Sequence, residues 1–284
     1  MYAITGITGK VGGAVARTLL SEGLHVRAVV REAAKGRFWR ELGCGVAIAE
    51  MEDAGALARA FTGVTDVFIL PPPIFDPEPG FPEAKAVISA VCQALDATRP
   101  RKVVCLSTIG AQAAQPNLLS QRTLLEQAMS ALPLPATFLR AAWFMENLIG
   151  DIAQAREQGV ISSFLQPLDK AMPMVATADV GRVAAELLQQ DWSDRRVVEL
   201  EGPQWVSQHA IASELSKALH RPVHAEAVPR EKWDAIFRGQ GMRNPIPRIQ
   251  MLDGFNEGWI RFEGGGAVVR GKVSLAEVVQ KLVS

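Results

Sequence analysis

The feature that most constrains the fold is a ladder of three glycines near the start of the chain, in MYAITGITGKVGGAVARTLL. Gly6, Gly9 and Gly12 follow a short apolar run, and the residues after them carry apolar side chains at helical spacing. Glycines at a strand-to-helix turn leave main-chain N–H groups and the helix N-terminus open to a phosphate. The ladder therefore predicts a strand, a turn that can bind a nucleotide, and a helix.

The alternation of strand and helix continues along the chain. Further strands are expected in HVRAVV, in residues 46–49, and in TDVFIL, RKVVCLSTIG and ATFLRAAWF, with helical stretches between them. Parallel neighbours cannot be joined by a tight turn, so strands separated in this way pair in parallel through right-handed crossovers. The pattern predicts an α/β fold with a doubly wound parallel Rossmann sheet.

The pattern weakens beyond Asn147, with one further helix from Asp179 and one further strand in RVVELEG. We expect residues 1–147 and 175–201 to form an NAD(P)-binding Rossmann domain. Residues 148–174 and 202–284 are expected to form a smaller C-terminal substrate lobe over the carboxyl ends of the strands, where such folds bind ligands. The glycine run at 264–266 precedes no helix and is expected to be a turn.

The charge balance limits the kinds of partner, and the cysteine content indicates the cellular compartment. The chain has 30 Lys plus Arg against 30 Asp plus Glu, so no excess positive charge favours nucleic acid or an anionic membrane surface. No apolar run approaches the roughly 18 residues of a membrane span, and no signal peptide is recognisable. Three scattered cysteines fit a reducing cytoplasm. We expect a cytoplasmic protein with a small-molecule partner, and leave open whether it is a homodimer.

The residues after the second strand indicate which dinucleotide binds. An acidic residue usually grips the ribose 2′-hydroxyl there, but this chain has Arg31, followed by Lys35. Two cations suit a 2′-phosphate, so NADP(H) is expected in preference to NAD(H). The alternative is a solvated helix start in which Glu32 neutralises one of the two. The other expected cofactor contacts are Gly6, Thr8, Gly9, Lys10, Val11, Gly12, Leu70, Pro71, Pro72, Ser107, Thr108 and Trp143.

Several of these segments resemble a known family in order and spacing. TGITGKVG, VRAVVREAAK, VVCLSTIGA, TFLRAAWFMENL and TADVGRVAAELL are similar to the NmrA-like branch of atypical short-chain dehydrogenases/reductases. The resemblance implies a Rossmann domain with a small substrate lobe. It also implies two functional classes, since members include NADPH-dependent quinone and triphenylmethane-dye reductases as well as regulators that bind the dinucleotide without turning it over.

The wider superfamily commonly uses a Tyr-x-x-x-Lys pair on the helix after the fifth strand. The only tyrosine here is Tyr2, and aligning Glu126 with the family's helix glutamate leaves Leu118 and Arg122 at the two positions. The absence of the Tyr and Lys of this pair argues against epimerase or alcohol dehydrogenase chemistry, which moves a hydroxyl proton with the hydride. Arg122 is a weak catalytic candidate that would stabilise negative charge on the acceptor, and the alternative is an ordinary surface arginine.

The segment after the sixth strand is the candidate acceptor pocket. Trp143 and Phe144 would form a flat apolar wall, with Asn147 as a polar contact. The sequence thus predicts an NADP(H)-dependent oxidoreductase that transfers hydride directly to a quinone or similar conjugated acceptor, without flavin or metal. The alternative is a non-catalytic NAD(P)-sensing regulatory protein that binds a protein partner.

Overall fold

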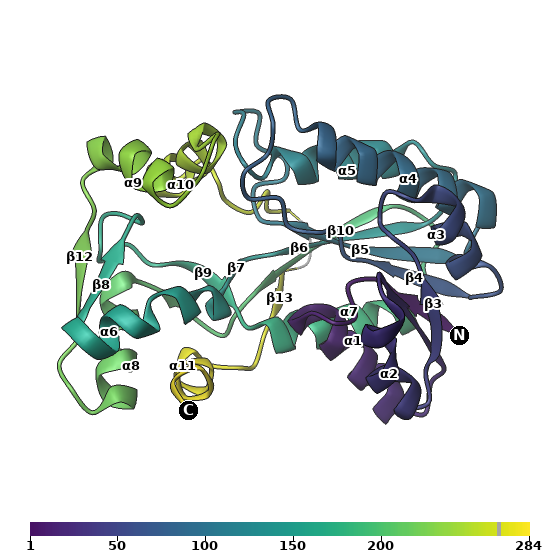
Figure 1. Cartoon of the computed structure of the whole chain (residues 1–284), viewed down its shortest axis with the longest axis horizontal. Helices are drawn as coiled ribbons and strands as arrows, with labels where there is room; N and C mark the ends of the chain where they lie inside the picture. Colours follow the sequence, from purple (N-terminus) through teal and green to yellow (C-terminus); the bar gives the residue numbers. More distant parts are fainter. Residues whose placement is uncertain (266–267) are drawn as a thin grey trace.

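One parallel eight-stranded sheet dominates the computed structural model, which describes residues 1–265 and 268–284 (Figure 1). The strand order is β13-β10-β6-β5-β4-β1-β2-β3, so the order reverses between β1 and β4. This confirms the predicted doubly wound Rossmann sheet. The strands are β1 (Tyr2–Ile4), β2 (Val26–Val30), β3 (Gly45–Ile48), β4 (Asp66–Ile69), β5 (Lys102–Thr108), β6 (Ala136–Ala141), β10 (Arg196–Glu201) and β13 (Val268–Arg270).

Helices cover both faces of this sheet (Figure 1). One face carries α1 (Lys10–Ser21), α2 (Ala33–Glu41) and α7 (Thr177–Gln189), and the other carries α3 (Ala54–Phe61), α4 (Pro82–Thr98) and α5 (Ser120–Ser130). Because both faces are covered, the central strands β4 and β6 are buried along their whole length. Helices α1 and α7 pack closely, since a Cβ on Gly181 would lie 2.3 Å from that of Ala14.

The remaining elements form a smaller lobe beside the carboxyl ends of the strands, on the left of Figure 1. Its core is a separate cluster of buried residues that includes Trp233 and Phe237. It contains a three-stranded sheet, β11-β9-β7, and a two-stranded sheet, β12-β8. Its elements are β7 (Trp143–Phe144), η1 (Met145–Gly150), α6 (Ile152–Gln158), β8 (Val160–Ser163), β9 (Met172–Val175), β11 (Trp205–Val206), α8 (Gln208–Leu219), β12 (His224–Ala227), η2 (Arg230–Lys232), α9 (Trp233–Gly239), α10 (Ile246–Glu257) and α11 (Leu275–Val283).

Strand β13 departs from the expected division of the chain. The sequence places its residues in the smaller lobe, whereas the structure pairs them with β10 at the edge of the main sheet. A three-residue strand is too short to show a hydrophobic period, so its pairing could not be read from the pattern. The expected turn at 264–266 ends at Gly266, which lies outside the described residues. Strand β7 and the start of η1 also belong to the smaller lobe, although the expected boundary kept residues up to 147 in the Rossmann domain. The other lobe boundaries stay predictions.

The described residues contain no helix whose length and apolar character would let it cross a membrane.

A buried aspartate ties the chain after β13 to the Rossmann domain. Asp179, in the first turn of α7, is 2% exposed and accepts hydrogen bonds from the backbone N–H groups of Lys272 and Val273, both at 2.8 Å. It also forms an ion pair with Arg182 at 3.0 Å. The contact is so close that a Cβ on Gly271 would lie 2.5 Å from the carboxylate.

Replacing this aspartate tests how strongly it holds the two parts together. Asp179→Ala leaves buried N–H groups without an acceptor, so we expect the free energy of unfolding to fall by about 2–5 kcal/mol in urea titrations. Glu186→Ala is the matched control, because Glu186 is an exposed partner of the same Arg182. It should change stability by less than about 0.5 kcal/mol. Equal effects of the two substitutions would contradict this assignment.

Candidate functional site

The glycine turn lies where the strand order reverses, at the carboxyl ends of β1 and β4. Thr5 joins the two strand ends: its hydroxyl donates to the carbonyl oxygen of Phe68 at 3.1 Å and accepts from the N–H of Leu70 at 2.7 Å. Gly6 then takes the left-handed conformation, with φ of +61°, which favours glycine. The chain turns there from β1 toward α1.

The start of α1 has the properties of a phosphate site. A Cβ on Gly12 would lie 2.3 Å from the carbonyl oxygen of Gly6, so this position accepts only glycine. A Cβ on Gly9 would meet nothing within 4 Å except that same oxygen, at 3.3 Å. Gly9 caps the helix without a side-chain bond, and the first turn carries no acidic residue. The helix N-terminus is thus open to a pyrophosphate, and the residues present fit one.

The other predicted contacts in this turn separate into two groups. Thr8 and Lys10 are exposed, so their side chains are accessible to a ligand. Val11 is 4% exposed and packs in the core of the Rossmann domain. Its side chain is therefore unavailable, and only its main chain can contribute to phosphate binding.

The two cations after β2 differ in their surroundings. Lys35 pairs with Glu32 at 2.9 Å, and this contact lowers the pKa of the Glu32 carboxyl. Arg31 is exposed and forms no ion pair with the part of the chain that the structure describes. Glu32 therefore neutralises Lys35, as the sequence alternative allowed for one of the two cations, and Arg31 remains the stronger candidate for a 2′-phosphate.

The exit of β4 forms the opposite wall. The side chain of Leu70 covers the glycine turn, since a Cβ on Gly6 would lie 2.6 Å from it. Pro71 is buried, Pro72 is half-buried, and the carbonyl oxygen of Pro71 accepts a hydrogen bond from Arg122 at 3.3 Å. This segment therefore lies close to both the glycine turn and α5.

Arg122 points inward. It lines a cavity of about 10 Å³ together with Pro71, Pro72 and Gln121, and burial lowers the pKa of its guanidinium. The alternative of an ordinary surface arginine is therefore wrong, because α5 turns this side chain toward α4 and the exit of β4. The cavity has room for no more than a water molecule, so it is not itself an acceptor pocket.

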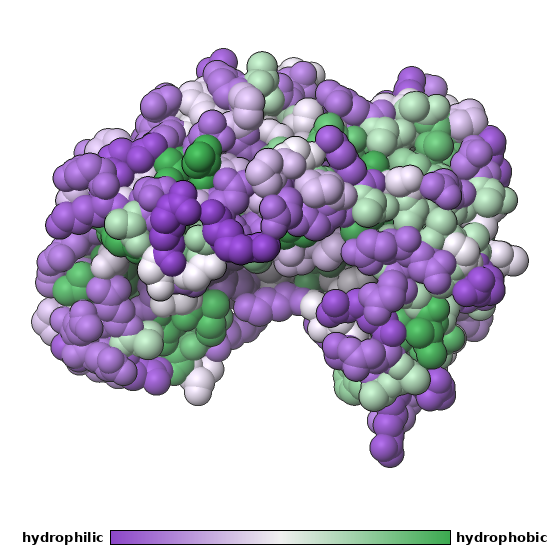
Figure 2. Space-filling view, turned by 45° about the horizontal axis from the view of Figure 1, so that its top comes forward, coloured by the Kyte–Doolittle hydropathy of each residue, from purple (hydrophilic) through white to green (hydrophobic). Residues whose placement is uncertain are grey.

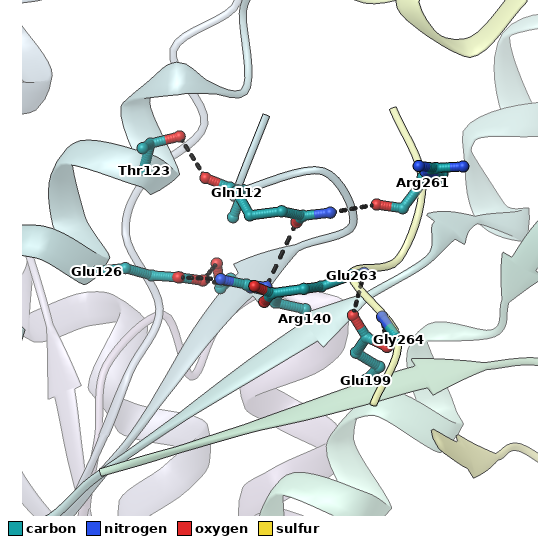
Figure 3. Close-up of polar contacts among 10 residues, drawn as sticks. Gln112, Thr123, Glu126, Arg140, Glu199, Arg261, Glu263 and Gly264 are labelled. Atoms are coloured by element: carbon teal, nitrogen blue, oxygen red, sulfur yellow. Dashed lines mark hydrogen bonds and ion pairs between the residues drawn. The ribbon is translucent and has the colours of Figure 1, made fainter. Parts of the chain in front are cut away.

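At the end of β5, Ser107 belongs to a buried polar network with Glu126 and Arg140, and Figure 3 shows the latter two residues. The Ser107 hydroxyl donates to the Glu126 carboxylate, which also receives two hydrogen bonds from Arg140, at 3.0 and 2.7 Å. The three residues are 4%, 9% and 5% exposed. The next residue, Thr108, is half-buried. The Ser107 hydroxyl therefore bonds to a side chain of α5.

The same network reaches the chain between α10 and β13 (Figure 3). Arg140 contacts Glu263 at 2.6 Å, and Glu199 accepts the N–H of Glu263 at 2.6 Å. Ser107, Arg140 and Glu199 are paired in register across β5, β6 and β10. Arg140 and Glu199 were not predicted as site residues, although charged residues inside predicted central strands are a signal for buried pairing.

The proposed aromatic wall does not form as one surface. Trp143 and Phe144 are successive residues of β7, so their side chains point to opposite sides. Trp143 packs edge-on against Phe255 in the smaller lobe, with ring centroids 5.2 Å apart, and Phe144 packs against the Rossmann core. The expectation of a joint wall is wrong, which leaves Trp143 on the lobe side and Asn147 exposed.

The only tyrosine lies at the opposite end of β1 from the glycine turn. Tyr2 begins β1 and pairs in register with Asp66 at the start of β4, at the amino ends of the strands. Burial raises the pKa of its phenol most, and the charge of the nearby Asp66 raises this pKa further. Leu118, at the usual tyrosine position, is buried.

Within the described residues no group of three or more metal-ligating side chains gathers. On the face shown in Figure 2, the surface is hollowed between the two lobes.

Three comparisons place this arrangement among known proteins. An NAD(P)H azoreductase of Xenophilus azovorans is 28% identical over 245 residues, which cover 85% of this chain and 82% of the relative. An Escherichia coli NADPH-dependent quinone oxidoreductase complexed with NADPH has a TM-score of 0.83 at 22% identity, over 100% of both chains. A Citrobacter triphenylmethane reductase complexed with NADP(H) has a TM-score of 0.80 at 20% identity, over 99% of this chain and 100% of that one.

The solved structures show the same fold, and the azoreductase extends the likeness to the sequence. The family model that matches is the NmrA-like family, and it covers residues 2–257. That range includes the glycine turn, the network residues of β5, α5, β6 and β10, and most of the smaller lobe. The chain belongs to the NmrA-like family.

Proposed function

We propose that the chain is an NADP(H)-dependent reductase that transfers hydride directly to a quinone or a similar conjugated acceptor. The observation that carries the proposal is the uncapped, glycine-lined N-terminus of α1. Arg31, which forms no ion pair within the described residues, follows the neighbouring strand β2 and adds to it. Support for the acceptor class comes from the relatives, which are named as reductases of azo compounds, quinones and triphenylmethanes.

Each part of the site has a distinct task in this proposal. Bound NADPH supplies the hydride. The N-terminus of α1 at Gly9 holds the pyrophosphate, and Arg31 binds the 2′-phosphate. Leu70, Pro71 and the end of β5 border the nicotinamide half, because the dinucleotide extends across the point where the strand order reverses. The main contribution of the protein is then to position the cofactor against the acceptor.

The proposed reaction does not require a protein side chain to supply a proton. Quinones and cationic dyes are strongly electrophilic, so hydride can add first and water can supply any proton needed afterwards. This accounts for function without the Tyr-x-x-x-Lys pair, whose positions hold Leu118 and Arg122. The positive charge of Arg122, close to Pro71, favours negative charge that develops on the acceptor.

The proposal is tested by following NADPH absorbance at 340 nm with a panel of quinones, azo dyes and triarylmethane dyes. We expect acceptor-dependent oxidation of NADPH by the purified protein without added flavin or metal. Tight NADPH binding with no oxidation by any acceptor would reject the reductase proposal and favour the dinucleotide-sensing regulator.

Gly9→Ala tests the phosphate site at the start of α1. The backbone of Gly9 has φ of −89° and ψ of 174°, which alanine can adopt, so stability should fall by at most about 1 kcal/mol. The added methyl group faces the open side of the turn, and we expect NADPH affinity to fall at least about tenfold. Gly55→Ala, at an exposed position of α3, is the control and should leave the dissociation constant unchanged. Unchanged NADPH affinity in Gly9→Ala would place the pyrophosphate elsewhere.

Arg31→Ala tests the choice of cofactor. Loss of a charge-assisted contact with the 2′-phosphate should weaken NADPH binding by about 10- to 100-fold and NADH binding by less than about twofold. Arg37→Ala removes a neighbouring exposed arginine of α2 that pairs with Glu41, and should change neither affinity. Isothermal titration of both cofactors gives the comparison. Equal weakening of NADPH and NADH in Arg31→Ala would show that Arg31 does not bind the phosphate.

A further inference from the structure

We infer that Glu126 is a positioning residue that makes Ser107 a hydrogen-bond acceptor toward the nicotinamide half of the cofactor. The inference rests on the proposed binding of NADP(H), and it does not depend on the reduction of any acceptor. It assigns a task to the buried network at the ends of β5 and β6, which the hydride-transfer proposal does not use.

The direction of the bond between Ser107 and Glu126 follows from the partners of the carboxylate. Arg140 donates to both Glu126 oxygens and is 5% exposed. A carboxylate bound in this way by a guanidinium is ionised and can only accept hydrogen bonds. The arginine also stays charged: burial acts to lower its pKa, but the bonds with Glu126 and Glu263 outweigh this and raise it. The Ser107 hydroxyl proton is therefore committed to Glu126.

Because its proton is bonded to Glu126, Ser107 can act toward a ligand only as a hydrogen-bond acceptor. A hydroxyl group has one proton and two lone pairs, so Ser107 can accept a further hydrogen bond but cannot donate one. It is thus unable to stabilise a developing oxyanion or to protonate the reduced acceptor. A group that contacts it must itself be a donor.

The position of Ser107 restricts that donor to the nicotinamide half of the cofactor. Ser107 is the last residue but one of β5, and β5 pairs with β4, whose exit leads directly to Pro71. Arg31 follows β2, on the other side of the point where the strand order reverses. If the adenosine half lies over β2, the nicotinamide half lies over β4 and β5. Its donors are the ribose hydroxyls and the carboxamide N–H groups.

The network offers a matched pair of substitutions around one arginine. Glu126 and Glu263 both contact Arg140, but only Glu126 bonds to Ser107. In Glu126→Gln an amide nitrogen at the Oε1 position can donate to Ser107 while it gives up the bond from Arg140 Nε. This releases the hydroxyl proton and reverses its polarity at almost constant volume. Glu263→Gln removes a carboxylate from the same guanidinium and leaves the serine bond intact. A general effect of disturbing Arg140 would appear in both variants.

The test measures dissociation constants for NADPH and for adenosine 2′,5′-bisphosphate, which carries the adenosine half alone. We expect Glu126→Gln to weaken NADPH about three- to tenfold, as for one hydrogen bond, and to leave the bisphosphate unchanged. Glu263→Gln should change neither constant. Unchanged NADPH binding in Glu126→Gln, equal weakening of both ligands, or the same weakening in Glu263→Gln would each overturn the inference.

Ser107→Ala keeps the inference testable if Glu126→Gln does not fold. It removes one small hydroxyl and leaves the ion pair of Glu126 with Arg140 in place. We expect the same selective loss of NADPH affinity, with no further loss in the double variant Ser107→Ala/Glu126→Gln. Additive losses, or normal NADPH affinity in Ser107→Ala, would overturn the inference.

An NADP⁺ analogue identifies the donor. In 3-acetylpyridine adenine dinucleotide phosphate, an acetyl group replaces the carboxamide and the amide N–H groups are absent. Persistence of the Ser107→Ala effect with this analogue supports a ribose hydroxyl as donor, and its selective loss supports the carboxamide. A wild-type protein that binds NADPH but reduces no acceptor would reject the proposed function and leave the inference standing.

Discussion

The close approach of Gly12 to the carbonyl oxygen of Gly6 is the constraint on which the site depends. A side chain at position 12 would place its Cβ 2.3 Å from that oxygen, so the first turn of α1 can lie against the end of β1 only with glycine there. The same approach directs the helix N-terminus toward the carboxyl ends of β1 and β4. Thr5 joins these two ends through hydrogen bonds to Phe68 and Leu70. The phosphate site is therefore built by backbone packing, with little contribution from side chains.

Buried charge organises the other half of the site. Ser107, Arg140 and Glu199 lie in register across three parallel strands, where apolar residues would normally fill the interior. Each polar atom has partners from α5 or from the chain before β13, so the cost of burying these charges is offset by hydrogen bonds. This network holds the smaller lobe's connecting chain against the ends of β5 and β6. Arg140 thus links α5 beside the end of β5 to the chain before β13.

Local sequence patterns were sufficient for the Rossmann sheet but not for several contacts within the site. The succession of β1 to β6 along the chain followed from hydrophobic periodicity, and the glycine turn from its spacing. Pairing of β13 with β10 depends on residues far apart in the chain and left no local signal. Phe144 was grouped with Trp143 because the end of the strand at Ala141 was not visible in ATFLRAAWF. A surface position for Arg122 stayed open as an alternative because helix periodicity alone does not show what α4 covers.

Direct hydride transfer is the central claim, and isotope transfer tests it most directly. The protein would be incubated with NADPH that carries deuterium at one of the two C4 positions and with a triarylmethane dye. The colourless product would then be analysed by mass spectrometry and NMR. The account predicts one deuterium at the central carbon of the dye from only one of the two labelled cofactors, because the fold presents one face of the nicotinamide. Protium from solvent at that carbon with both labelled cofactors would contradict direct transfer.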